Sequence, residues 1–164
     1  MSLKKIFTFC AAAIIFFAIL QSCQSSLSSK QVAAPTDTHL GEMMGQMQYY
    51  VVKLGLALQH RNQPLASFYM NEVNEAYQSI VDKNIMLDSL DISKMIQEIL
   101  APAKNQLSQA IQQNDTTNFL SGYHAMIMKC NNCHHETNHQ FIVIEEPHED
   151  FNGQNFNVQP LLKK

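Results

Sequence analysis

The chain of 164 residues has few cysteines and few charges. Only two of its four cysteines, Cys130 and Cys133, lie in the body of the sequence, so a zinc site built from four cysteines is excluded. Charged residues make up 15% of the chain and the net charge is −3, which indicates no nucleic-acid partner. We also find no nucleophile–base pair and no phosphate-binding loop, so nothing in the sequence indicates an enzyme.

Long apolar runs are also scarce, and the one at the N-terminus is short. Ile6 to Leu20 is apolar and follows Lys4 and Lys5, but a membrane-spanning helix needs about 20 apolar residues. A basic start, a short apolar core and a small residue before the cut are typical of a signal peptide. The run ends in Leu20-Gln21-Ser22-Cys23, which resembles the lipobox of bacterial lipoproteins.

The lipobox resemblance implies cleavage after residue 22 and lipidation of Cys23. We therefore expect residues 1–22 to be a signal peptide and the Ser-rich residues 23–37 to be a flexible tether. The expected location is periplasmic and lipid-anchored, and Gln24, where inner-membrane lipoproteins carry Asp, favours the outer membrane. An uncleaved membrane anchor is the alternative.

The chain as a whole has a length and an apolar content, 46%, that suit one packed domain. Apolar residues recur at helical spacing over about residues 38–62, 64–83, 91–113 and 115–136, and strand-type alternation is missing. Pro102 predicts a kink or a break in the third segment. The predicted fold is all-α, an antiparallel up-down four-helix bundle over residues 38–138, with an irregular tail, residues 139–164, packing on it.

One short motif carries chemistry, Cys130-Asn131-Asn132-Cys133-His134. A Cys-x-x-Cys-His run is the signature of covalent haem attachment. The two thiols add across the two haem vinyl groups, and the histidine binds the iron from the proximal side. A redox dithiol or half of a zinc site are the alternatives, although His135 and His139 do not complete the usual zinc spacing.

The bundle topology suggests where a sixth iron ligand would lie. The end of the fourth helix is level with the first turns of the first helix, which contain Met43, Met44 and Met47. Methionine opposite histidine raises the reduction potential and suits electron transfer. A methionine at helical spacing more often fills the core, so an absent ligand stays open, as does His39, which would lower the potential.

The region from Leu40 to Phe156 resembles the class II c-type cytochromes, of the cytochrome c′ and cytochrome c556 type. In these proteins the haem motif lies near the end of the fourth helix, and low-spin members use a Met near the start of the first. More narrowly, Leu40-Gly41-Glu42-Met43-Met44 resembles a Leu-Gly-Glu-Ile-Met stretch of small bacterial haem proteins, which also carry Cys-Asn-x-Cys-His and Phe-Ile-x-Ile segments. The resemblance implies Met44 as the sixth ligand.

The tail contains two further apolar or amide-rich stretches. Phe141 to Ile144 is expected to pack over an exposed haem edge or over the bundle. Residues 151–156 are similar to the Asn-Gln-containing tail of the same bacterial group, with Gly153 where Asn is expected. His124 and His39 are candidates for contact with a haem propionate.

The expected function is a monohaem c-type cytochrome, a periplasmic membrane-tethered electron carrier and not an enzyme. One haem c would be attached at Cys130 and Cys133, with His134 proximal and Met44 distal, Met47 and Met43 being alternatives to Met44. The expected partners are periplasmic or membrane redox proteins and, through the lipid, the membrane; a homodimer stays open. The alternatives are a five-coordinate module of cytochrome c′ type that binds nitric oxide or carbon monoxide, and a haem-free dithiol or metal protein.

Overall fold

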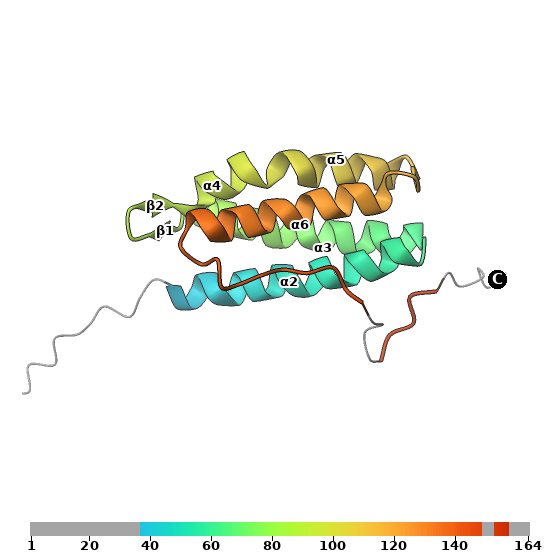
Figure 1. The fold of residues 1–164 in the computed structure, drawn as a ribbon, viewed down its shortest axis with the longest axis horizontal. Coiled ribbons are helices and arrows are strands. Elements are labelled where there is room, and N and C mark those ends of the chain that lie inside the picture. The colour runs from blue at the N-terminus through green and yellow to red at the C-terminus, as the bar shows by residue number, and fades with distance from the viewer. Residues whose placement is uncertain (1–36, 149–152, 158–164) are drawn as a thin grey trace, which may run out of the picture. The chain divides into compact units, whose positions relative to one another are not determined.

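The structure, a computed structural model, describes residues 37–148 and 153–157 (Figure 1). Helices dominate this part of the chain, so the predicted all-α fold class is confirmed. The elements are, in chain order, α2 (Asp37–Gln59), α3 (Gln63–Asp82), β1 (Met86–Leu87), β2 (Leu90–Asp91), α4 (Ile92–Ile99), α5 (Ala101–Gln112) and α6 (Phe119–Glu136). Helix α2 packs against α3, α5 packs against α6, and α2 also contacts α6.

A tight turn joins α2 to α3 where the sequence predicts it. Arg61 takes up the left-handed region with φ of 51°, and the next residue, Asn62, caps α3 by accepting a hydrogen bond from the Leu65 amide at 3.3 Å. Pro64 lies in the first turn of α3, where a missing amide hydrogen costs nothing. The turn therefore follows from local residue chemistry.

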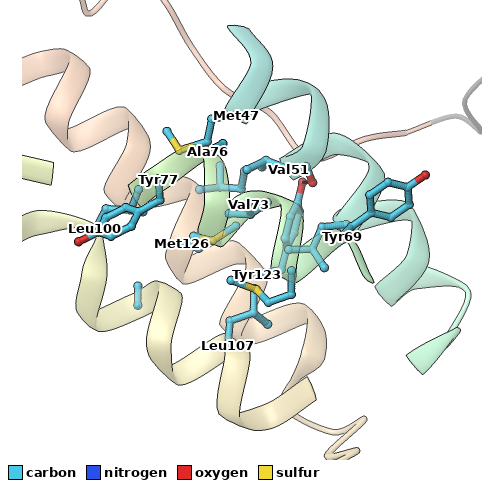
Figure 2. Close-up of a cluster of buried hydrophobic side chains, with 14 of the residues drawn as sticks. Met47, Val51, Tyr69, Val73, Ala76, Tyr77, Leu100, Leu107, Tyr123 and Met126 are labelled. Carbon is cyan, nitrogen blue, oxygen red and sulfur yellow. Dashed lines mark hydrogen bonds between the residues drawn. The ribbon is translucent and has the colours of Figure 1, made fainter. Parts of the chain in front are cut away.

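The core lies between α2, α3, α5 and α6. Figure 2 shows buried side chains from these helices that meet there, among them Val51, Val73, Leu107, Tyr123 and Met126. Helices α2 and α6 approach closely at Gly55, because a Cβ atom there would lie 2.6 Å from Cζ of Tyr123. The buried Tyr123 hydroxyl donates to the Val51 carbonyl at 3.0 Å, so the same ring both packs and satisfies its polar atom.

The predicted third helix is two helices. Leu100 lies between the two helices, as the C-cap of α4 and the N-cap of α5. Pro102 lies in the first turn of α5. Proline has no amide hydrogen for the carbonyl four residues back, so it interrupts the helix. The break falls at the place where a kink or a break is predicted.

Two local features differ from what the sequence predicts. Residues 86–91, most of which lie between the second and third predicted helical segments, form a short antiparallel ribbon in which Met86 pairs with Asp91 and Leu87 with Leu90. Helix α6 begins at Phe119 and not at Asp115 or Thr116. The polar residues before it build a turn instead, in which Nδ2 of Asn118 donates to Asp115 at 2.6 Å.

The chain reverses after α6 and returns along the helices. Asn138 takes up the left-handed conformation with φ of 61°, which is typical of the residue that follows a helix end. Residues 139–148, which we call the strap, then run back along α2 (Figure 1) and also bond to side chains of α6. The strap is held by side chains of both helices, through the pairs Asn131–Ile144, His124–Glu146 and Gln59–Pro147.

Residues 153–157 dock at the turn between α2 and α3. Phe156 is 1% exposed and packs against the rings of His60 and Tyr69. Asn62 donates to the carbonyl oxygens of Phe156 at 3.0 Å and Asn157 at 3.2 Å. This part of the predicted irregular tail has no helix or strand, yet it contributes a core side chain.

The predicted signal peptide, the lipidation site Cys23 and most of the tether lie outside the described residues. Among the helices of residues 37–148, none combines the length and the apolar character needed to cross a bilayer.

Candidate functional site

A cavity of about 210 Å³ lies between the first turns of α2 and the last turns of α6. Leu87 and Ile92 close it from the ribbon and α4, and Ile142 and Ile144 close it from the strap. Most of its lining is apolar. The polar or sulfur-bearing side chains that line it are those of Met44, Met47, Gln48, Cys130, Cys133, His134, Thr137 and His139. The structure therefore brings the Cys-x-x-Cys-His motif and two methionines of α2, Met44 and Met47, to one cavity.

The two motif thiols lie one helical turn apart on α6, and neither forms a disulfide. Cys133 is buried and Cys130 is half-buried. Burial, together with the nearby Cys133, raises the pKa of Cys130 to about 12. Burial and Glu136 also raise the pKa of Cys133. Both residues are thus neutral thiols near pH 7, whereas the reactive cysteine of a redox dithiol has a lowered pKa.

His134 is oriented by the main chain of the strap. Its Nδ1 lies 2.8 Å from the Ile142 carbonyl oxygen, and since a carbonyl can only accept, Nδ1 carries the hydrogen. In the neutral imidazole this arrangement leaves the lone pair on the other nitrogen, Nε2, which is the form that binds a metal. The sequence could not predict that Ile142 orients His134, because the group that accepts the hydrogen bond is a backbone carbonyl.

Two of the three methionines considered as iron ligands line the cavity. Met44 and Met47 line it, while Met43 does not. Met47 is 7% exposed and belongs to the hydrophobic core, whereas Met44 is half-buried at the edge of that core. His39 lies elsewhere, with its side chain 81% exposed and 3.7 Å from Glu42.

The other histidines are arranged differently from the sequence hypotheses. His124 is exposed and pairs with Glu146 at 2.8 Å, away from the cavity lining. His139 does line the cavity, although no sequence pattern distinguishes it from the neighbouring histidines. Its Nδ1 lies 2.7 Å from the Thr137 carbonyl oxygen, so Nδ1 carries the hydrogen here too.

The apolar run of the strap is divided between two environments. Ile144 is buried and Ile142 lines the cavity. Phe141 is 76% exposed and Val143 is 61% exposed. Of this run, only Ile142 and Ile144 turn toward the cavity and the helices, because an extended segment turns alternate side chains to opposite sides.

Within residues 37–148 and 153–157, no three His, Cys, Asp or Glu side chains converge as ligands of a single metal ion. Comparisons with protein families, with curated proteins and with solved structures give no match for this chain.

Proposed function

We propose that this chain is a monohaem c-type cytochrome that carries electrons. The observation that supports this best is the lining of one apolar cavity by Cys130, Cys133, His134 and Met44. The thiols would hold the haem covalently, His134 Nε2 would bind the iron, and the Met44 thioether would bind it from α2. Each thiol would form one carbon–sulfur bond to a vinyl group and give its hydrogen to the neighbouring vinyl carbon, so this attachment would need no oxidant or reductant.

The donor set fits the group in type and environment. Haem supplies one-electron chemistry, and histidine with methionine as axial ligands favours the reduced state. The side chains of Val51, Ile92 and Ile144 would keep water away from the iron. The cavity is smaller than the roughly 300–1,000 Å³ of most ligand pockets, so the haem would be only partly enclosed.

We further propose that the helices form an antiparallel four-helix bundle, in which α4 and α5 together make one broken arm. The neighbours α2–α3 and α5–α6, and the contact of α2 with α6, support this arrangement. The resemblance to class II c-type cytochromes also supports it. In that fold the haem site lies where α6 ends and α2 begins, which is where the cavity lies.

We also propose that the protein is exported, lipidated at Cys23 and tethered in the periplasm. The support is the sequence of residues 1–23 together with the motif, because haem is attached to such motifs outside the bacterial cytoplasm. The expected partners are periplasmic or membrane redox proteins.

The decisive experiment is expression of the exported chain together with haem-attachment machinery. We expect one haem per chain and a haem-stained band that survives denaturing electrophoresis. The double variant Cys130→Ser/Cys133→Ser should lose the band. A colourless wild-type protein would exclude this function and leave the haem-free alternatives.

The sixth ligand is tested by a matched pair of variants. Met44→Ala should convert a low-spin spectrum to a high-spin one and open the iron to carbon monoxide. Met47→Ala should keep the low-spin spectrum but lose about 2–5 kcal/mol of stability, because Met47 is buried. A wild-type protein that is already high-spin and binds carbon monoxide would favour the gas-binding alternative.

A further inference from the structure

We propose that Asn131, in the spacer between the two motif cysteines, positions the proximal histidine by clamping the strap, and thereby lowers the reduction potential. This inference rests on the proposed haem function. Asn131 would not touch the iron. It would act through the Ile142 carbonyl, which accepts the hydrogen bond from His134 Nδ1 at 2.8 Å.

The clamp consists of two hydrogen bonds between one side chain and one backbone unit. Nδ2 of Asn131 donates to the Ile144 carbonyl oxygen at 2.9 Å, and the Ile144 amide donates to Oδ1 of Asn131 at 2.8 Å. A side-chain amide that is bonded in both directions fixes both the position and the rotation of the segment it holds. Asn131 and His134 lie one turn apart on α6, so the clamp and the imidazole share one rigid element.

Ile142 is thereby anchored from both sides. On the preceding side, its amide donates to the His139 carbonyl at 2.8 Å, and the His139 amide donates to the His134 carbonyl at 2.7 Å. On the following side, two residues further along the strap, Asn131 holds Ile144. The carbonyl between these anchors has little freedom to turn away from the imidazole.

This anchoring matters because the His134–Ile142 bond lies at an exposed position. Water competes well for an exposed hydrogen bond, so a loose strap would exchange the carbonyl for solvent. A fixed carbonyl on Nδ1 makes the imidazole a more basic ligand. A more basic ligand stabilises ferric iron relative to ferrous iron, so the clamp lowers the potential.

The experiment compares two asparagines of the same spacer in the haem-loaded protein. Asn131→Ala removes both clamp bonds, while Asn132→Ala alters an exposed neighbour and serves as the control. We expect the reduction potential of Asn131→Ala to rise by about 59 mV. For a one-electron couple this corresponds to a tenfold change in the equilibrium constant for reduction. Amide exchange at Ile144 should accelerate in the same variant. Asn132→Ala should match the wild type in both measurements.

Two results would overturn the inference while leaving the haem function intact. One is faster exchange at Ile144 with an unchanged potential, which would make Asn131 a purely structural clamp. The other is an equal shift of potential in Asn132→Ala. If Asn131→Ala does not load haem, the test uses Asn131→Gln, which keeps the amide on a longer side chain. The reduction potential of Asn131→Gln should rise by less than about 59 mV. An unchanged potential in this variant would also overturn the inference. A wild-type protein that loads no haem would remove both the function and the inference.

Discussion

At both ends of the helical body an asparagine binds the returning chain, but one end is filled by a side chain and the other contains a cavity. At each end an asparagine side chain grips the backbone of the returning chain: Asn131 holds Ile144, and Asn62 holds Phe156 and Asn157. At the α2–α3 turn the captured segment inserts Phe156 into the core and fills the space. At the motif end the strap instead leaves a cavity of about 210 Å³.

The difference lies in what the returning chain presents to the helices. Phe156 presents a large ring to His60 and Tyr69, and it is 1% exposed. In the strap the large ring, Phe141, turns outward, and two isoleucines face the cavity. The comparison teaches that one end is closed for stability, while the other keeps room beside its sulfur and imidazole groups.

The largest effect on stability is expected from the phenylalanine at the closed end. Phe156→Ala should lower the free energy of unfolding by about 3–5 kcal/mol, because it empties a filled position in the core. Phe141→Ala should change it by no more than about 0.5 kcal/mol, because that ring is 76% exposed. Urea denaturation of both variants measures the difference. Equal losses would contradict the distinction between a closed and an open end.

A smaller difference is expected between the two asparagines. Asn62→Ala should cost about 2–3 kcal/mol, because it removes the cap of α3 and leaves the Phe156 carbonyl, buried in the core, without its donor. Asn131→Ala should cost about 1 kcal/mol, because its partners are only partly buried. Thermal unfolding of the haem-free forms gives both values. If Asn131→Ala lost more free energy of unfolding than Asn62→Ala, the end with Phe156 would not be the more stabilising of the two.

Substitutions at two glycines of α2 should change stability in opposite directions. Gly45 lines the cavity, and a Cβ atom there would meet nothing within 4 Å. Gly45→Ala should therefore stabilise the haem-free chain by about 0.5–1 kcal/mol, while lowering the haem content per chain. Gly55→Ala should destabilise it by about 1–3 kcal/mol, because its Cβ would collide with the Tyr123 ring. Undiminished haem content in Gly45→Ala would show that the cavity wall at α2 is not part of the site.

Local chemistry explains most of what could be predicted about the fold. The apolar spacing of α2, the stop before Pro64 and the break near Pro102 each follow from residues a few positions apart. The start of α6 could not be predicted in this way, because Asn118 and Asp115 bond to each other and form a turn that competes with the helix. The β1–β2 ribbon was also missed, since two-residue strands carry no alternation to detect.

For the candidate site, the sequence by itself determined the chemical groups. A pair of thiols followed by an imidazole is a local pattern, so residues 130–134 are enough to identify these groups. Only the tertiary structure decided which methionines share a cavity with that pattern, and that His39, His124 and Met43 do not. It also decided that a backbone carbonyl from the strap orients His134. These facts depend on how distant segments pack, and a main-chain oxygen is the same in every residue, so no sequence pattern could reveal them.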